Sequence, residues 1–398
     1  MRIAIDGRYI QDHFPGIGRY TYNLIRALAG VVEQDTVVVI HNPRLPNTRF
    51  AMADLGRLPY VEMVTTAVAP FSLAEQWLLP RLARQLDVDV WHSPYYICPY
   101  CLPCPLVVTV YDAISSHYPQ YLPSLAARFS YEVAMRLAMT TARRVIAISQ
   151  VSRADLIRFF AVPAAKVSVI AGAAEPRYRP QPPQAVAELR ARLGLSDAYV
   201  LYVGSNKPHK NIVRLVEAWA IVGALSATAD QLTRVGTLQA ASPATPPQLV
   251  IAGHHDPRYP QAQDRAQQLG VQSSVRFLGA VAEADLPVLY SGAAAFVFPS
   301  LYEGFGLPAL EAMACGVPVI CSNTPALLEV VGDAALTVNP LDTNALAQAI
   351  ARLLHDSALR HDLGQRSLKQ ASHFSWQRAA QEALAAYQAA RTSDRTLL

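Results

Sequence analysis

The chain contains, at residues 298–320, the segment Phe298-Pro-Ser-Leu-Tyr-Glu303-Gly-Phe-Gly306-Leu-Pro-Ala-Leu-Glu311-Ala-Met-Ala-Cys-Gly316-Val-Pro-Val-Ile320. The apolar runs at 294–298 and 317–322 predict two buried strands of a parallel sheet. Between them, Gly304 and Gly306 predict a loop whose backbone a ligand can approach closely, because glycine has no Cβ. A short helix is expected over 308–314, since a proline suits its first turn and a glycine follows its end. The segment therefore predicts a strand, a glycine loop, a helix and a second strand.

Two carboxylates, Glu303 and Glu311, stand on either side of this glycine loop. A glycine loop that opens a helix presents free N–H groups and the positive end of the helix dipole, and both attract phosphate. A carboxylate accepts hydrogen bonds from sugar hydroxyls. The pattern therefore indicates a nucleotide-sugar site. The alternative is an ordinary strand–helix–strand unit whose glutamates face solvent.

The segment resembles the signature of the family-4 retaining glycosyltransferases, which have the GT-B fold. The resemblance implies an α/β fold class, with two Rossmann-like domains whose parallel sheets face each other across a cleft that holds the active site. It also implies that Glu311 holds the ribose hydroxyls of the donor and that Glu303, as a catalytic residue, contacts the transferred sugar. The backbone N–H groups that would bind the sugar and the diphosphate belong to Gly304, Phe305, Gly306 and Leu307.

A second loop, residues 204–211, follows a predicted strand at 200–203 and precedes a helix expected over 212–221. Lys210 lies at the mouth of that helix, which suits the binding of a diphosphate. In the resembled family this loop is similar to Gly-Arg-x4-Lys, in which both cations neutralise the leaving diphosphate. Lys210 matches the catalytic lysine, whereas Ser205 stands at the arginine position.

The charge that Ser205 lacks has to come from another side chain, and Lys207 and His209 are the nearby candidates. For Lys207 the alternative is an unpaired lysine on a loop. A further strand is predicted at 275–279, and the resemblance implies that its edge at Leu278 binds the nucleobase through backbone groups.

The first half of the chain begins with a predicted strand at 3–6, a loop that ends at residues 14–20, and a helix over 20–29. Gly16 and Gly18 in that loop suggest a dinucleotide fingerprint, but no third glycine follows and the loop is long for a Rossmann turn. This argues against a hydride-transfer enzyme. The resemblance implies instead that Gly18 approaches the donor phosphate or the acceptor.

Further strands of the first half are predicted at 36–42, 61–65, 88–92, 106–110, 145–149 and 166–170. Helices are expected over 73–86 and 124–142, with Leu78, Leu79 and Leu82 directed inward in the first of them. Another helix is expected to begin at Ser149, which is a good capping residue. His92, at the end of its strand, is expected to form a local hydrogen bond rather than to act as a catalyst.

Tyr111 and Asp112 follow the strand at 106–110 and therefore lie at the carboxyl edge of the sheet, where ligands bind in open α/β sheets. The resembled family often has His-Asp at this place. Asp112 matches and is a catalytic candidate, whereas Tyr111 departs from the pattern.

Two domains are expected from the length of 398 residues. The first spans 1–180 and the second 184–375, and the proline-rich residues 177–184 are interpreted as the linker. By resemblance the terminal helix at 376–398 packs back on the first domain. Residues 222–247 are interpreted as an extended helix end with a surface insertion.

The net charge of +4 is concentrated in the first half, where residues 1–198 hold 20 Lys and Arg against 15 Asp and Glu. This is too weak for a nucleic-acid partner but permits an anionic acceptor or a peripheral contact of the first domain with a membrane. Arg128 and Arg136 of the helix over 124–142 could form a basic flank for a lipid-linked acceptor, or simply a solvated face. No apolar run approaches the ~18 residues of a membrane span, and the first residues form a strand rather than a signal peptide. We expect a cytoplasmic protein, peripheral at most at the inner face of a membrane.

Three of the five cysteines, Cys98, Cys101 and Cys104, have a spacing like that of an iron–sulfur site. A cluster needs a fourth ligand, and the remaining thiols lie in the donor-site segment. A proline-rich loop with incidental thiols is therefore the preferred interpretation, and a metal site is the alternative.

The sequence thus predicts a retaining, metal-independent hexosyltransferase that moves a sugar from a nucleotide diphosphate sugar to a hydroxyl of a glycan or lipid-linked acceptor. No cofactor is expected, and no Asp-x-Asp metal motif follows a strand. Mannose from a guanine nucleotide is the preferred donor, by resemblance to the polysaccharide-assembly members of the family. The alternative is a nucleotide-sugar-binding protein of the same fold with little or no activity.

Overall fold

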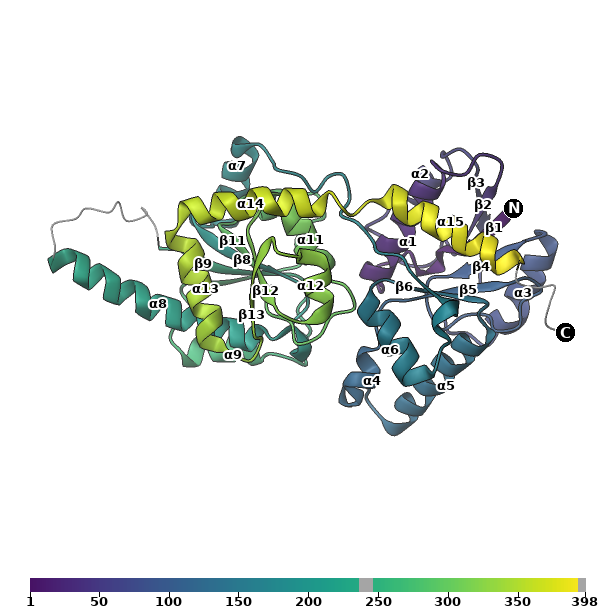
Figure 1. The fold of residues 1–398 in the computed structure, drawn as a ribbon, viewed down its shortest axis with the longest axis horizontal. Coiled ribbons are helices and arrows are strands. Elements are labelled where there is room, and N and C mark those ends of the chain that lie inside the picture. Colours follow the sequence, from purple (N-terminus) through teal and green to yellow (C-terminus); the bar gives the residue numbers. More distant parts are fainter. Residues whose placement is uncertain (236–245, 393–398) are drawn as a thin grey trace. The chain divides into compact units, whose positions relative to one another are not determined.

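The computed structural model describes residues 1–235 and 246–392 and divides the chain into two compact units. Unit 1 consists of Met1–Gly172 together with the chain from Phe374 onward, and unit 2 of Ala173–His373. Each unit is one parallel sheet with helices packed on both faces (Figure 1). The α/β fold class expected from the sequence is therefore confirmed.

Unit 1 contains a seven-stranded parallel sheet in the order β3-β2-β1-β4-β5-β6-β7. Its strands are short runs rich in valine and isoleucine, and β5 is buried at all five positions, as expected for a strand covered on both faces. The strands are β1 Arg2–Asp6, β2 Thr36–His41, β3 Val61–Thr65, β4 Val90–Ser93, β5 Leu106–Val110, β6 Arg144–Ala147 and β7 Val167–Val169.

The helices of unit 1 form two layers. One layer, made of α3, α5 and α6, shares a hydrophobic core with one face of the sheet. On the other face, α1 packs against α15, and α15 contacts β4, β5 and β6. The helices are η1 Gly7–Tyr9, α1 Pro15–Leu28, α2 Met52–Leu55, α3 Glu75–Gln85, α4 Ile114–His117, η2 Pro119–Tyr121, α5 Leu125–Thr141, α6 Gln150–Phe160, η3 Ala164–Lys166 and α15 Trp376–Thr392.

The terminal helix α15 is joined to unit 1 by aromatic contacts and a buried hydrogen bond. The ring of Trp376 lies edge-on to Tyr20 of α1 with centroids 5.5 Å apart. The hydroxyl of Tyr387 lies 2.8 Å from Nδ1 of His92, and Nε2 of His92 lies 2.7 Å from the hydroxyl of Thr109. The local hydrogen-bonding role expected for His92 is thereby confirmed.

Helix α1 begins at Pro15, so the expectation of a glycine loop up to residue 20 is wrong. A Cβ on Gly18 would lie 3.0 Å from the ring of Phe50 and 3.2 Å from the carbonyl oxygen of Tyr9. Gly18 therefore lets the first turn of α1 pack directly on the chain that follows β1. A proline and two glycines indicate a loop locally, but tertiary packing makes this turn helical.

Two other expectations for unit 1 have different outcomes. Ser149 accepts a hydrogen bond from the N–H of Ser152, which confirms it as the N-cap of α6. Leu78 was expected inside, but it is 47% exposed. Leu79 is buried and Leu82 packs against the core, as expected, and the buried face of α3 also includes Glu75, Pro80 and Ala83.

Unit 2 contains a six-stranded parallel sheet in the order β10-β9-β8-β11-β12-β13. The strands are β8 Tyr199–Val203, β9 Gln248–Ala252, β10 Val275–Gly279, β11 Ala295–Phe298, β12 Val319–Ser322 and β13 Ala335–Val338. Helices α8, α9 and α13 pack together, as do α10, α11, α12 and α14, and the sheet lies between these groups (Figure 1). The helices are α7 Pro183–Leu193, η4 Pro208–Lys210, α8 Ile212–Val235, α9 Gln261–Gln268, α10 Leu286–Ser291, α11 Leu307–Ala314, α12 Pro325–Val331, α13 Thr343–His355 and α14 Ser357–Ala371.

The segment expected to be a linker, residues 177–184, packs on unit 2. Arg177 pairs with Glu283 at 2.8 Å, and the N–H of Gln181 donates to the hydroxyl of Ser291 at 3.2 Å. Helix α8 extends to Val235, as expected for the start of the segment 222–247, while residues 236–245 of that segment lie outside the described residues.

Within residues 1–235 and 246–392, no helix combines the length and the apolar character that a membrane-spanning segment requires.

Candidate active site

The glycine loop lies at the carboxyl end of β11 in unit 2 and leads into α11. Gly306 has φ +120°, and a Cβ there would lie 2.6 Å from the side chain of Leu327 on α12. Only glycine satisfies both the backbone conformation and this close approach. Helix α11 begins at Leu307, with Pro308 in its first turn and the ring of Phe305 buried beside it. Gly304 and Leu307 are partly buried. The first N–H groups of a helix have no partner within it, so the loop is suited to bind an anion.

The loop after β11 is joined to the loop after β8, because these two strands are neighbours in the sheet. The side-chain amide of Asn211 donates to the carbonyl of Pro299 at 3.0 Å, and the N–H of Leu301 donates to the carbonyl of His209 at 2.7 Å. Asn211 has φ +60°, a left-handed conformation that asparagine tolerates. The two loops predicted from the sequence to bind the donor therefore form one structure.

Lys210 and Glu303 form an ion pair at this junction. The ammonium of Lys210 donates to both carboxylate oxygens of Glu303, at 2.8 and 2.9 Å. The two side chains are only 17% and 11% exposed, and the ammonium also lies 5.4 Å from the ring centroid of Phe298. The two residues were expected to have separate roles, and their ion pair was not predicted from the sequence.

Glu311 is buried in the middle of α11, with 2% of its surface exposed. The hydroxyl of Tyr290, on α10, donates to its carboxylate at 3.1 Å. A carboxylate can accept about four hydrogen bonds, so more than one hydroxyl can donate to the same side chain.

A cavity of about 260 Å³ opens at the carboxyl ends of β8, β9 and β10. It is lined by Gly204, Asn206, His254, Tyr259 and Leu278, among others. Among these lining residues, only Leu278 was predicted from the sequence to belong to the site. The cavity lies along the same edge of the sheet as the Lys210–Glu303 pair, since β8 is shared by both.

The walls of this cavity are held in place by a close contact between two glycines and by the side-chain amide of Asn206. A Cβ on Gly253 would lie 2.2 Å from the carbonyl oxygen of Gly204, so the two loops approach backbone to backbone. The amide of Asn206 donates to the carbonyls of Asp256 and Tyr259 at 2.9 and 2.8 Å, which fixes the loop after β9. From the sequence, Asn206 is only a polar residue two positions after Gly204.

The loop at 205–209 supplies less positive charge than its composition suggests. Ser205 is partly buried, and its carbonyl accepts from the hydroxyl of Tyr202 at 2.9 Å. Burial, together with the charges of Lys210 and Lys207, lowers the pKa of His209 to about 3. His209 is thus neutral at neutral pH in the protein without ligand, which makes it a weaker candidate for replacing the missing arginine. Lys207 is exposed, and it remains a candidate for supplying the positive charge of the missing arginine.

Gly18 and Asp112, the other predicted site residues, lie in unit 1. A carboxylate oxygen of Asp112 accepts from the N–H of Ile114 at 3.0 Å, so it begins the turn after β5. The ring of Tyr111 lies edge-on to Tyr20 at 5.5 Å, and its hydroxyl is buried. Burial raises the pKa of Tyr111 well above its usual value, so this phenol is not a base at neutral pH.

A buried ionic cluster that was not predicted from the sequence lies at the carboxyl end of β1. The guanidinium of Arg8 donates to Asp6 at 2.8 and 2.6 Å and to Glu75 at 3.0 Å, and all three side chains are almost fully buried. No motif marks these residues, because Glu75 is distant in sequence. The cluster fixes α3 against the first strand.

The cysteine loop shows no metal-binding arrangement. All five thiols are free, Cys98 is buried and Cys101 is exposed. Among residues 1–235 and 246–392, no three His, Cys, Asp or Glu side chains gather as metal ligands would.

Comparison with known proteins agrees with this architecture. Residues 187–370 match the model of the glycosyl transferases group 1, and residues 15–176 match that of glycosyltransferase family 4. The chain is 30% identical to the O-antigen chain mannosyltransferase B of Escherichia coli over 397 residues, which cover 97% of this chain and 99% of that protein. It belongs to the family-4 glycosyltransferases, as the sequence segment around Glu303 and Glu311 predicted.

Two further proteins are similar along their whole length. The MMP alpha-(1->4)-mannosyltransferase of Mycolicibacterium hassiacum is 28% identical, with 98% of each chain covered. The structure of Anabaena HepE in complex with UDP-glucose aligns with a TM-score of 0.71 at 21% identity, covering 97% of this chain and 99% of that chain. The GT-B fold is thereby confirmed.

Proposed function

We propose that this glycosyltransferase moves mannose from a guanine nucleotide diphosphate sugar to a hydroxyl of a glycan or lipid-linked acceptor, with retention of the anomeric configuration. The Lys210–Glu303 pair beside the glycine loop is the observation that carries the proposal. The mannosyltransferases among the similar proteins support the sugar, and the UDP-glucose complex of HepE supports a nucleotide-sugar donor in this fold.

The cavity along β8, β9 and β10 is assigned to the nucleobase and the junction of the two loops to the diphosphate and sugar. A cavity of this size accommodates a flat heterocycle, and Leu278 lies in its wall. Glu311 is assigned to the ribose hydroxyls. Because its carboxylate is buried, a hydroxyl that reaches it would form a charge-assisted hydrogen bond shielded from water.

Lys210 is the main cation for the departing diphosphate. An ammonium has three donors, and Glu303 accepts from it with both of its oxygens, so at least one donor is left for a phosphate oxygen. The N–H groups of residues 304–307 and the dipole of α11 add to the stabilisation as the sugar leaves. Glu303 in turn orients the transferred sugar through its remaining lone pairs.

The acceptor proton is proposed to pass to an oxygen of the donor's own phosphate, on the same face as the attack. This step needs no protein base, which accords with a buried, neutral phenol at position 111. No divalent metal is proposed to be required, because Lys210, the N–H groups of residues 304–307 and the dipole of α11 would stabilise the charge of the departing diphosphate. A cytoplasmic location stays a prediction of the sequence.

The proposal is tested by incubating the protein with GDP-mannose, GDP-glucose and UDP-glucose and with a panel of mannose-terminated glycans. We expect transfer from GDP-mannose, an unchanged anomer by proton NMR, and the same rate in a strong chelator. Lys210→Ala should lower turnover, and Lys369→Ala, which removes an exposed lysine on α14, is the matched control. Transfer from another donor, inversion, or binding of nucleotide-sugars without turnover would each overturn a stated part of the proposal.

A further inference from the structure

Exposed apolar side chains are concentrated on one layer of unit 1. In the described part of this unit, ten large hydrophobic side chains are exposed, and nine of them belong to α3 with its preceding loop, to α5 or to α6. The tenth is Tyr60. Scattered exposed hydrophobic residues are ordinary, but a concentration on one face marks an interaction surface.

Helix α5 carries an apolar stripe directed away from the core. Leu125, Phe129, Val133 and Leu137 follow one another at intervals of four residues, which places them on one helix face. Leu125 is 78% and Phe129 72% exposed. The opposite face of α5, which includes Met135 and Ala138, is buried against the sheet.

Helix α3 has an outer face of the same kind. Trp77 on α3 is 63% exposed, and Leu73, in the turn that precedes the helix, is 79% exposed. Arg81 and Arg84 follow Trp77 at four and seven residues, so they share its face. Tryptophan with arginine on an outer helix face is typical of contact with the interface of a lipid bilayer.

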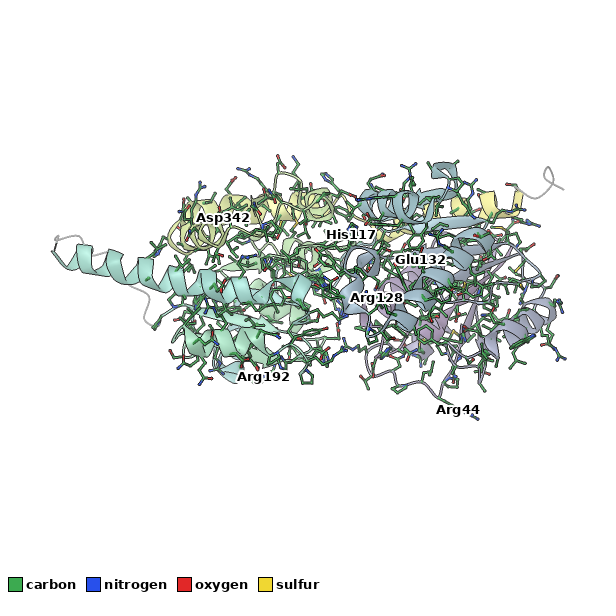
Figure 2. All side chains as sticks on the ribbon, turned by 90° about the horizontal axis from the view of Figure 1, so that it is seen from below. Arg44, His117, Arg128, Glu132, Arg192 and Asp342 are labelled. Carbon is green, nitrogen blue, oxygen red and sulfur yellow. The ribbon has the colours of Figure 1, made fainter. Side chains whose placement is uncertain are left out.

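The exposed apolar faces of α3 and α5 lie on the same side of unit 1. The inner faces of α3, α5 and α6 join one hydrophobic core on one face of the sheet, with Leu79, Met135 and Leu156 among its members. Their outer faces are therefore all directed away from that sheet. Figure 2 looks onto this side and labels Arg128 and Glu132 of α5.

The exposed charges of this layer are mostly positive. Helices α3, α5 and α6 carry six arginines and three acidic residues. Two of the acids, Glu75 and Asp155, are buried and bonded to Arg8 and His117. Glu132 alone is on the outer surface, where it pairs with Arg136. The outer surface of the three helices is therefore both apolar and cationic.

A cavity of about 590 Å³ opens beside the end of α5, at the amino ends of β5 and β6. Its lining includes Thr140, Arg143, Arg144 and Lys166. Asp112 follows the carboxyl end of β5, whereas this cavity lies at the amino end of the same strand. The cavity is therefore separate from the predicted catalytic residue of this unit. A cationic cavity next to an apolar stripe is suited to a phosphate headgroup.

We propose that the outer layer formed by α3, α5 and α6 docks on an anionic phospholipid bilayer, with Leu73, Trp77, Leu125 and Phe129 inserted at the interface and the arginines against the headgroups. A second copy of the chain is a poorer occupant, because a twofold contact would bring this cationic surface against itself. Docking would hold the enzyme at the surface where lipid-linked acceptors reside. The inference adds a partner to the proposed function, but it does not depend on the donor.

The test is vesicle flotation of the full chain without nucleotide-sugar, on phosphatidylglycerol/phosphatidylcholine vesicles and on phosphatidylcholine vesicles. The wild type should bind the anionic vesicles and lose most of this binding in 1 M salt, where the screening length is ~3 Å. The double variant Leu125→Ser/Phe129→Ser should bind at least tenfold less tightly. Arg81→Glu, which reverses a charge on α3, should lower affinity by well over the about fivefold expected for one lost cation near an anionic surface.

Leu341→Ser is the matched control, because Leu341 is 63% exposed and lies in unit 2. All variants change exposed side chains, so their Tm values and their affinities for GDP should equal those of the wild type. Absence of binding to anionic vesicles, or equal binding by the double variant and the wild type, would overturn the proposal. A dimer in size-exclusion chromatography that Phe129→Ser converts to a monomer would instead assign the surface to self-association. Failure of the donor proposal would leave the flotation result unchanged.

Discussion

The Lys210–Glu303 pair can be tested by removing each charge separately and then both. Lys210→Ala leaves a largely buried carboxylate without its cation, and Glu303→Gln leaves an ammonium without its anion. Hydrogen bonds to charged groups contribute about 1.5–3 kcal/mol, and fully exposed ion pairs at most about 1 kcal/mol. Because the pair is bidentate and only 17% and 11% exposed, we expect a coupling free energy of about 2 kcal/mol between the two substitutions.

The same variants should affect ligand binding in opposite directions. Glu303→Gln removes a negative charge next to the proposed diphosphate site, so GDP should bind at least about fivefold more tightly, since a charge a few ångströms away contributes about 1 kcal/mol even at the dielectric constant of water. Lys210→Ala should weaken GDP binding modestly and lower turnover much more, because charge develops on the diphosphate as the sugar leaves. Turnover should also fall in Glu303→Gln, since the sugar loses its orienting carboxylate.

Denaturant unfolding without ligand gives the coupling free energy, and isothermal titration with GDP gives the affinities. Lys369→Ala is carried through both measurements as the control. A coupling below about 0.5 kcal/mol would mean that the pair contributes no more than an exposed contact. Weaker GDP binding by Glu303→Gln would refute the placement of the diphosphate beside Lys210.

Three further predictions concern single side chains. Glu311→Ala should weaken GDP binding at least tenfold, because a buried carboxylate accepting from the ribose contributes about 1.5–3 kcal/mol; unchanged affinity in calorimetry would reassign this residue. Tyr111→Phe should retain turnover within about tenfold in a steady-state assay, while Asp112→Ala should lose more, and a loss of three orders of magnitude in Tyr111→Phe would make the phenol catalytic. Burial lowers the pKa of His92 from 6.5 to about 3. Below pH 6.5 this histidine is therefore protonated in the unfolded chain, whereas in the folded chain it stays neutral down to about pH 3. The contribution of His92 to the free energy of unfolding should therefore be constant well above pH 6.5 and should be lower by about 2 kcal/mol at pH 5. Denaturation of His92→Gln at both pH values should show a smaller decrease than the wild type, and an equal decrease would contradict the assignment.

The sequence predicted the parts of the fold that local patterns determine. The strand at 106–110 has the sequence Leu-Val-Val-Thr-Val, which is rich in β-branched residues, and its predicted bounds agree with β5. The glycine loop before α11 and the stop at Gly316, which has φ +74°, follow from backbone conformations that side chains other than glycine disfavour. These features need no knowledge of what packs nearby.

The features that were missed depend on contacts between distant segments. The first turn of α1 contains a proline and two glycines, and it is helical because Gly18 packs on the backbone near Tyr9. Helix α12 packs on α11 and α14, and no local pattern in the sequence indicates these contacts.

The same limit applies to the site. Lys210 and Glu303 are brought together by the adjacency of β8 and β11, which no local pattern reports. The burial of His209, which makes it neutral, comes from the same junction of loops. Residue types and their spacing indicated the chemistry of the site, whereas the order of the strands determines which of those residues meet.

The central claim is that the loops after β8 and β11 hold the diphosphate of a nucleotide-sugar. A crystal structure of the protein with GDP tests it most directly. We expect a phosphate oxygen within hydrogen-bond distance of the ammonium of Lys210 and of the N–H groups of residues 304–307, with the ribose hydroxyls on Glu311 and the guanine in the cavity beside Leu278. A diphosphate bound elsewhere, with the Lys210–Glu303 pair unchanged, would contradict the account.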